Sequence, residues 1–538
     1  MTEFSLAFNR ALHFFKQEKS NNSLQDILRG LEKESLRITP QGTLAQTPHS
    51  RNLGSALTHP KITTDYSEAL LEFITPPFNR GENLLDELNR IHRYTYAQIH
   101  QQNEILWPSS MPCKLGKDAD IPVAQYGSSN SGKMKTVYRL GLGHRYGRSM
   151  QTIAGIHYNF SLPDSFWQAL KSLHQPNADE SLQDFKTRGY FALIRNFRRY
   201  YWLLIYLFGA SPAVCSCFVE NRQHQLTPFT YAEHTHYLPY ATSLRMGDLG
   251  YQSDAQKKLV VNYNNVQDYL RTLCQAITET HPAYASIGVK DQQGQYQQLN
   301  NSLLQIENEF YSSIRPKRTT QRGETALQAL RLRGVEYIEV RCVDLNPYEP
   351  LGITETQIQL MDAFLLYCIL SPSPTTDDKE FYQGQENQRR IVNKGRAPDL
   401  QLQRGDADVL MKDWALEILQ ACLQCADLLD QSSANQSYRL SVEEQIKKIH
   451  QPELTPSACI LREMQNQQKS FYDFTYGLAK QHADYFLQQP LSDELLQEYS
   501  ALAETSLKEQ AALEENQTTG FDEYIQGYFA QYQACQYC

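Results

Sequence analysis

Residues 30–37, Gly-Leu-Glu-Lys-Glu-Ser-Leu-Arg, constrain the fold of this chain more than any other segment. The two carboxylates, Glu32 and Glu34, are two residues apart, so on an extended strand both project from one face and Lys33 from the other. Two carboxylates on one face repel each other unless a cation lies between them, and a divalent metal ion is the usual partner. A solvated helical turn is the alternative, so the choice depends on acidic partners elsewhere in the chain.

The clearest strand pattern is Val-Glu-Tyr-Ile-Glu-Val-Arg, which ends at Arg341. Alternation places Ile338 and Val340 on one face and Tyr337, Glu339 and Arg341 on the other. A strand with one apolar and one charged face is either an outer strand at the surface or the floor of a charged active site.

Residues 62–75 have β-branched and aromatic residues at both ends, which predicts two strands. If the chain turns at Glu68 and Ala69, then Asp65 and Glu72 face each other across a hairpin, on one side of the sheet.

A further acidic pair, Glu307 and Glu309, again has a spacing of two and precedes a basic stretch. Acidic residues from four segments could thus converge, and magnesium is typically held by carboxylates together with nucleotide phosphates. The chain also supplies arginines suited to gripping carboxylate or phosphate, namely Arg139, Arg245, Arg315 and Arg341. Acidic residues that can bind metal ions, together with arginines that can bind anions, indicate nucleotide-dependent phosphoryl transfer.

Residues 127–133, Gly-Ser-Ser-Asn-Ser-Gly-Lys, have the spacing of a phosphate-binding loop up to the last position. There Met134 replaces the Ser or Thr that should ligate magnesium, and the preceding strand pattern is short and contains Pro122. A phosphate-loop nucleotidase is therefore disfavoured.

The 11 cysteines are an odd number, scattered through the chain without a secretory segment. This pattern indicates free thiols in a reducing compartment, and we expect a cytoplasmic protein. Two Cys-x-x-Cys pairs, Cys422/Cys425 and Cys535/Cys538, have the spacing of zinc ligands. Because no histidine is near and the pairs are far apart, we expect core packing for the first pair and a loose tail for the second.

The net charge of -9 and the absence of a long basic run give no general attraction to nucleic acid or anionic lipid. One segment, 200–219, is uncharged and long enough for a membrane span, and it follows Arg195, Arg198 and Arg199. A glycine, a serine and a proline interrupt it between 209 and 212, which favours a buried helix, a turn and a buried strand.

From about residue 384 the composition becomes rich in Gln and the apolar pattern becomes helical. We therefore expect a catalytic α+β core over residues 1–385. A mainly helical part over residues 386–538 is expected to pack on that core.

Segments spread in order over most of the first 350 residues carry a family resemblance, namely 30–37, 53–59, 62–76, 107–113, 155–161, 207–212, 240–245, 304–309 and 336–341. In these segments the chain closely resembles the proteobacterial type of glutamate–cysteine ligase. Beyond about residue 400 the resemblance is weak.

The resemblance implies an enzyme that uses ATP to join the γ-carboxyl of L-glutamate to the amino group of L-cysteine through a γ-glutamyl phosphate. The products are γ-glutamylcysteine, ADP and phosphate, in the first step of glutathione biosynthesis. The implied fold is α+β and related to glutamine synthetase, with a curved, mainly antiparallel sheet that forms a funnel-shaped active site surrounded by helices. Magnesium, with manganese as the alternative, is the implied metal; a monomer is one alternative for the assembly, and no nucleic acid or membrane partner is expected.

Position by position, the resemblance implies that Arg341 is catalytic and faces the transferred phosphoryl group. The implied magnesium ligands are Glu32, Glu34, Asp65, Glu72 and Glu339. The implied substrate-binding residues are Tyr138, Tyr251 and Tyr311 for cysteine, and Arg139, His157 and Arg245 for glutamate.

Two other functions stay open. One is a related carboxylate–amine ligase that accepts a different amine. The other is a catalytically silent sensor of an amino acid or a nucleotide, which the full set of metal-binding acids together with Arg341 disfavours.

Overall fold

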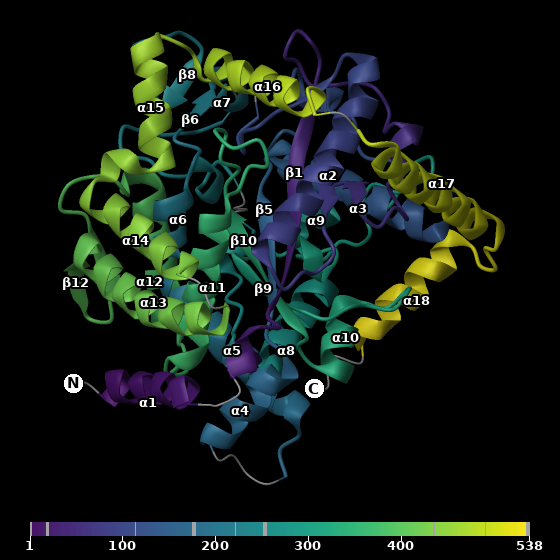
Figure 1. Cartoon of the computed structure of the whole chain (residues 1–538). Coiled ribbons are helices and arrows are strands. Elements are labelled where there is room, and N and C mark those ends of the chain that lie inside the picture. Colours follow the sequence, from purple (N-terminus) through teal and green to yellow (C-terminus); the bar gives the residue numbers. More distant parts are fainter. Residues whose placement is uncertain are drawn as a thin grey trace.

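Seven antiparallel strands form the central sheet in the described part of the chain, in the order β2-β3-β1-β5-β10-β9, with β4 paired to the end of β1 (Figure 1). The computed structural model describes residues 3–17, 21–112, 114–174, 179–220, 222–250, 255–433, 436–489 and 491–533. The strands are β1 (Leu28–Ile38), β2 (Ile62–Thr64), β3 (Leu70–Ile74), β4 (Ile105–Leu106), β5 (Ile156–Ser161), β9 (Ile314–Lys317) and β10 (Tyr337–Val343). The expected strands over 30–37 and 335–341 and the α+β class are confirmed.

Alternation along the strands gives the sheet one apolar face and one polar face. Leu31, Tyr158 and Val340 are fully buried side by side on the apolar face. Lys33 lies on this face too, as predicted, and its Nζ is 2.7 Å from Nε2 of His92. Burial lowers the pKa of Lys33 to about 7.

Helices cover the apolar face. Helix α2 (Gly81–Ile99) packs on β1 and β3, and α5 (Leu182–Tyr200) packs on β9. Helix α11 (Glu355–Leu370) lies against both helices and is buried at every residue from Gln357 onward, because its sequence is apolar on all sides. A capping box between Thr354 and Gln357 starts this helix.

The hairpin over 62–75 forms, but its register differs from the predicted one. The turn is centred on Glu68 and Ala69, as predicted, and is closed by a 2.9 Å backbone hydrogen bond. Strand β2, however, pairs Thr63 with Glu72. Asp65 and Glu72 are therefore not opposite each other, because an irregular stretch separates β2 from the turn.

The uncharged segment 200–219 folds into helix α6 (Trp202–Phe208), strand β6 (Ala213–Cys215) and the short helix α7 (Ser216–Val219), which confirms the buried helix, turn and strand. None of the described helices combines the length and apolarity that crossing a membrane requires.

The phosphate-loop spacing at 127–133 belongs to the cap of helix α3 (Asn130–Tyr146). Ser129 Oγ accepts a hydrogen bond from the Gly132 amide, and the Ser128 amide donates to the Glu514 carboxylate at 2.7 Å. A carboxylate of the chain thus occupies an amide that a phosphate would need. The phosphate-loop alternative is wrong.

The C-terminal third is mainly helical and wraps around the core. In Figure 1 helices α13 to α18 run from the left edge over the top and down the right side, and α16 and α17 both pack on α2. The division expected after residue 385 falls inside helix α12 (Asp378–Lys394) and stays a prediction. These helices are α13 (Met411–Ser433), α14 (Ser437–His450), α15 (Pro456–Gln467), α16 (Phe471–Leu487), α17 (Asp493–Glu515) and α18 (Phe521–Gln533).

Cys422 and Cys425 are buried in α13, where burial raises the pKa of both thiols, as expected for core packing. Cys535 and Cys538 lie outside the described residues. The other helices are α1 (Glu3–Gln17), α4 (Asp164–His174), α8 (Val266–Thr278), α9 (Pro282–Ala285) and α10 (Ala326–Arg333). Two small sheets, β6-β8-β7 and β11-β12, are completed by β7 (Thr227–Pro228), β8 (Thr235–Tyr237), β11 (Gln401–Arg404) and β12 (Ala407–Leu410).

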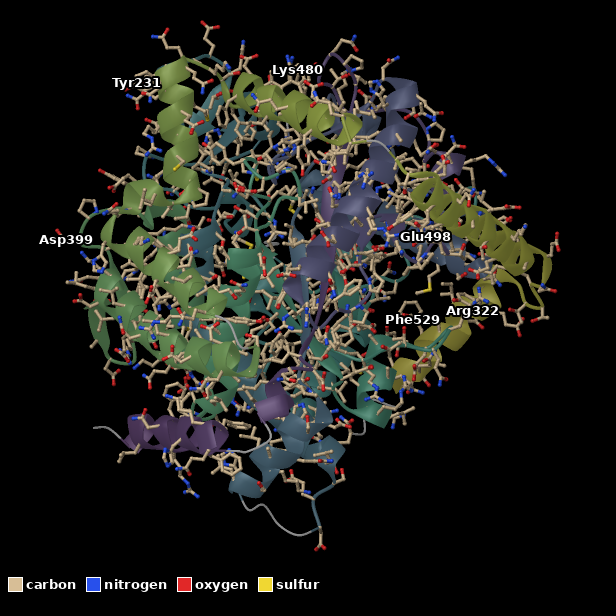
Figure 2. The ribbon with its side chains drawn as sticks, in the orientation of Figure 1. Tyr231, Arg322, Asp399, Lys480, Glu498 and Phe529 are labelled. Atoms are coloured by element: carbon tan, nitrogen blue, oxygen red, sulfur yellow. The ribbon has the colours of Figure 1, made fainter. Side chains whose placement is uncertain are left out.

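Charged side chains occur both at the rim of the molecule and inside it. Asp399 and Lys480 are exposed at the rim (Figure 2). Glu34 and Glu339, on the polar face of the central sheet, are buried. Buried carboxylates need partners, which makes this face the first place to look for a functional site.

Candidate functional site

The polar face of the central sheet carries polar or charged side chains from five neighbouring strands. The register places Glu34 opposite Glu72, Glu32 opposite His157, and Glu339 opposite both Asn159 and Arg315. The predicted convergence of Glu32, Glu34, Glu72 and Glu339 on one face is therefore present. We call one set of these residues the acidic face, namely Glu32, Glu34, Glu72, His157, Asn159 and Glu339. We call the neighbouring cations its basic edge, namely Arg315, Lys317 and Arg341.

Three side chains of this face could hold a metal ion together. Ligand atoms of Glu32, Glu72 and His157 all lie within 4.8 Å of one another. His157 Nδ1 is 3.1 Å from a Glu32 oxygen, and the Asn159 amide donates to the other Glu32 oxygen at 2.9 Å. Burial lowers the pKa of His157, and the nearby Arg341 lowers it further, so the imidazole is neutral and its Nε2 is free to act as a ligand.

Burial, together with nearby like charges, raises the pKa of two acids on this face. Burial, followed by repulsion from Asp65, raises the pKa of Glu34 to about 8. Burial also raises the pKa of Glu72 well above its usual range, and Glu32, Asp65 and Glu34 add to the effect. These carboxylates are crowded without enough positive charge, and a bound cation would relieve the crowding.

Glu339 lies at the opposite, basic edge. Its carboxylate is 3.3 Å from Lys317 Nζ and 3.3 Å from Arg341 Nη1. Burial opposes ionisation, but the positive charges of Lys317, Arg341 and Arg315 hold the pKa of Glu339 well below its usual range. One carboxylate thus connects the acidic residues to a group of cations that suits an anionic ligand.

Arg245 approaches the acidic face next to Gly155, where the absence of a side chain leaves room for its guanidinium. A Cβ at Gly155 would lie 2.0 Å from Arg245 Nη2, so only glycine allows this approach. The Gly155 amide donates to Glu34 at 2.7 Å, and Arg245 donates to the Arg341 carbonyl at 3.0 Å. Asp344, 3.6 Å from Arg245 Nη1, balances the charge from behind.

A cavity that is open to solvent adjoins this region. Arg245, Tyr311 and Arg341 line it, together with Arg198 of α5 and Phe381 of α12. Three of the predicted site residues are therefore brought to one cavity, and α12, the helix that contains the expected division after residue 385, supplies part of its wall.

The remaining predicted residues lie elsewhere. Arg139 donates to the carbonyls of Asp65 and Lys135 and lies 4.5 Å from the centre of the Tyr126 ring. Tyr138 is half-buried on α3 and is not among the residues that line this cavity. Tyr251 lies outside the described residues.

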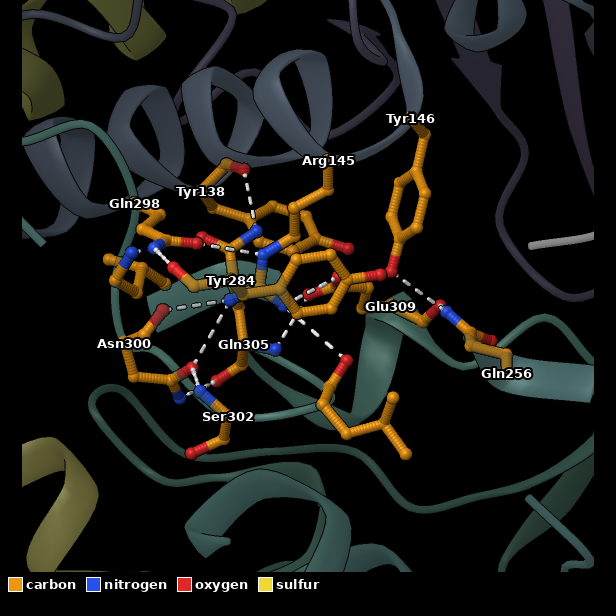
Figure 3. Close-up of polar contacts among 12 residues, drawn as sticks. Tyr138, Arg145, Tyr146, Gln256, Tyr284, Gln298, Asn300, Ser302, Gln305 and Glu309 are labelled. Carbon is orange, nitrogen blue, oxygen red and sulfur yellow. Dashed lines mark hydrogen bonds and ion pairs between the residues drawn. The ribbon is translucent and has the colours of Figure 1, made fainter. Parts of the chain in front are cut away.

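Glu307 and Glu309 do not join the acidic face, so that expectation is wrong. They form a short 3-10 helix, and the Glu309 carboxylate accepts bonds from Arg145 at 2.9 Å and from Tyr146 at 2.6 Å (Figure 3). Figure 3 also shows Gln256 reaching Tyr146 from the other side. Gln256 in turn accepts a hydrogen bond from the Tyr311 amide at 3.1 Å. Through Tyr146 and Gln256, the buried pair Arg145–Glu309 therefore supports the loop that carries Tyr311.

Sequence reasoning left Asn159, Lys317 and Arg198 out of the site. Asn159 and Lys317 had a usable signal, because each lies two residues after another residue of this face, His157 and Arg315. Arg198 had none, since its place beside the cavity depends on how α5 packs.

Comparisons with known proteins agree with this geometry. The profile of the glutamate-cysteine ligase family matches residues 12–391. The glutamate–cysteine ligase of Saccharophagus degradans is 52% identical over 95% of this chain and 96% of its own, and that of Alcanivorax borkumensis is 51% identical over 96% and 98%.

Two solved structures are similar. The glutamate–cysteine ligase of Francisella tularensis in complex with AMP has a TM-score of 0.88 and 37% identity, covering 95% of this chain and 98% of that one. A bifunctional glutathione synthetase from Pasteurella multocida has a TM-score of 0.71 and 25% identity, covering 91% of this chain and 58% of that one. With the family profile spanning more than half of its length and relatives about 50% identical over nearly all of it, the chain belongs to the glutamate–cysteine ligase family.

Proposed function

We propose that the acidic face and its basic edge carry out the reaction of this family through a γ-glutamyl phosphate intermediate. The chain is an ATP-dependent ligase that forms γ-glutamylcysteine, in the first step of glutathione biosynthesis. The observation that carries the site assignment is the row of carboxylates across the sheet, which ends at Glu339 between Lys317 and Arg341.

The chemistry explains why both halves of this face are needed. A carboxylate resists attack by an amine because it is electron-rich and has a poor leaving group. Phosphorylation of the γ-carboxyl by ATP removes both obstacles, and the amine then displaces phosphate. Moving the phosphoryl group requires cations at its oxygens and in-line positioning, with little covalent work for the protein.

Magnesium fits the acidic face. Oxygen-rich acids suit a hard divalent cation, and the face holds buried atoms without a hydrogen-bond partner at His157 Nε2, Asn159 Oδ1 and Glu339 Oε2. We assign Glu32, Glu34, Asp65, Glu72 and Glu339 as the ligands and move His157 from the glutamate-binding group to this one, because it lies in the cluster with Glu32 and Glu72. Bound magnesium, or manganese in its place, would neutralise charge on the nucleotide phosphates.

The protein's own cations complete the site. Arg341 lies beside Glu339 and at the cavity wall, so we assign its planar guanidinium to the oxygens of the transferred phosphoryl group. Lys317, on the other side of Glu339, is suited to a second phosphate oxygen. Glu34, His157 and Glu339 are buried on this face, which limits the access of water to an acyl phosphate formed beside them and so slows its hydrolysis.

The amino-acid substrates are assigned to the cavity beyond Arg341. Arg245 and Arg139 are proposed for glutamate, and Tyr138, Tyr251 and Tyr311 for cysteine. Arg245 and Tyr311 line the cavity, which supports these two. Arg139 is held by backbone carbonyls, which favours an indirect part in which it positions the loop at Asp65. We further propose that the enzyme acts in the cytoplasm and as a monomer.

The test is ADP release with glutamate alone, with cysteine alone, and with both, followed by identification of the product by mass. Release that requires both amino acids supports the proposal. Equal or faster release with another amine in place of cysteine would instead favour the related carboxylate–amine ligase, and no release with any amine would favour the silent sensor.

A further inference from the structure

Arg198 stands at the wall of the substrate cavity without a counter-ion in the part of the chain that the structure describes. Its guanidinium carbon lies 4.7 Å from the centre of the Tyr263 ring and 5.3 Å from that of Phe381. Among the described residues it makes neither an ion pair nor a hydrogen bond. Aromatic rings hold an arginine in place, but they offer no oxygen to its N–H donors and no charge to balance it.

Two other arginines of the same helix show what a structural arginine looks like here. Arg195 donates to the carbonyls of Tyr263, Asn264 and Ser373. Arg199 pairs with Glu380 and also donates to the Pro374 carbonyl. Both satisfy most of their donors within the protein, whereas Arg198, which lies between them in the sequence, lines the cavity beside Arg341.

The described residues that line the cavity include four cations and no acid, namely Arg198, Arg245, Lys257 and Arg341. Three of the four have a carboxylate nearby. Arg245 is 3.6 Å from Asp344, Lys257 is 3.6 Å from Asp248, and Arg341 is 3.3 Å from Glu339. Among the described residues that line the cavity, Arg198 is therefore the cation that has no carboxylate nearby to balance its charge.

Arg198 also lies where the cavity adjoins a second one. It lines both cavities, which share Tyr201, Phe381 and Gln385 as well, whereas Arg341 lines only the first of the two. A substrate that presents its reacting group to Arg341 would therefore place its distal end toward this shared wall.

We propose that Arg198 binds the α-carboxylate of an amino-acid substrate and so positions that substrate for ligation. This inference rests on the proposed function, because glutamate and cysteine each carry an α-carboxylate that the reaction leaves intact. A bidentate arginine–carboxylate contact sets both the position and the orientation of its partner. Tyr263 and Phe381 hold the guanidinium in place before the substrate arrives, which reduces the entropic cost of binding.

The experiment compares the wild-type enzyme with Arg198→Gln and Arg198→Lys by steady-state ADP release, varying glutamate and cysteine separately. We expect Arg198→Gln to raise the KM of one amino acid by about 10- to 100-fold with little change in kcat, because a charged hydrogen-bonded contact is lost. Arg198→Lys should recover part of the loss. The amino acid whose KM changes identifies the carboxylate.

Substrate analogues supply a readout that a structural role would not move. Cysteamine replaces cysteine, and 4-aminobutyrate replaces glutamate; each lacks only the α-carboxylate. For the affected substrate, Arg198→Gln should leave the KM of its analogue unchanged. An analogue KM that rises as much as that of the amino acid, or unchanged KM values for both amino acids, would overturn the proposal.

Arg188→Gln is the matched control. Arg188 lies on the same helix, is 60% exposed at its side chain and pairs with Glu180, so its removal should change neither KM. If the wild-type enzyme released no ADP with glutamate and cysteine together, the proposed function would fail before any variant was measured. The two failures are thus distinguishable.

Discussion

Acidification should weaken magnesium binding to the nucleotide-free enzyme, because the metal must displace protons from the acidic face. Glu34 has a pKa of about 8, so below this pH its carboxyl is mostly neutral. For one proton displaced, apparent affinity falls about tenfold per pH unit, or about 1.4 kcal/mol. The raised pKa of Glu72 adds a second proton, so we expect a fall of about 10- to 100-fold between pH 7 and pH 6.

Stability follows from the same shift. Because the pKa of Glu34 in the folded, metal-free protein lies above its unfolded value, this group contributes stability at low pH and loses it as the pH rises toward 8. Magnesium should restore what is lost. The increase in Tm on adding magnesium should therefore be larger at pH 8 than at pH 6.

Isothermal titration calorimetry at pH 6, 7 and 8 measures this linkage directly. Repeating each titration in two buffers of different ionisation enthalpy counts the protons released. Glu34→Gln is the control, since it should bind magnesium more weakly but with a shallower dependence on pH. An affinity that is constant from pH 6 to 8, or binding without proton release, would refute the reasoning.

Three further predictions concern single residues. Glu32→Gln should lower turnover by about 100-fold or more and raise the magnesium requirement, because the metal loses a charged ligand; normal turnover at ordinary magnesium would contradict the ligand assignment. Arg341→Lys should lower kcat by about 100-fold although the charge is kept, since the planar fork is lost, and wild-type rates would refute its assignment to the phosphoryl group. Glu309→Gln should cost about 3–5 kcal/mol in urea unfolding, because Arg145 is left buried without its counter-charge. The exposed control Glu504→Gln should leave the midpoint unchanged, and an equal midpoint in both variants would count against the Arg145 pair.

Much of the acidic face was predictable because it lies on strands. A spacing of two puts Glu32 with Glu34 on one face and Lys33 on the other whatever surrounds the strand, and the structure agrees. The same argument was wrong for Glu307 and Glu309, because spacing carries meaning only where the backbone is extended, and here it forms a 3-10 turn.

The hairpin shows a second limit. Its turn at Glu68 and Ala69 follows from local composition, but the irregular stretch after β2 moves Glu72 opposite Thr63. A shift of this kind depends on how the loop packs, which alternation does not report.

The sequence by itself determined the strands, the faces of their alternating residues, the family and the reaction, because these depend on local periodicity and on motifs that are continuous in the chain. Only the tertiary structure decided which strands are neighbours, that His157 joins Glu32 and Glu72, and that Arg198 lines the cavity beside Arg341 while Arg195 and Arg199 do not. These arrangements arise from contacts between residues far apart in the chain. Long-range packing sets them, and no local pattern in the sequence encodes it.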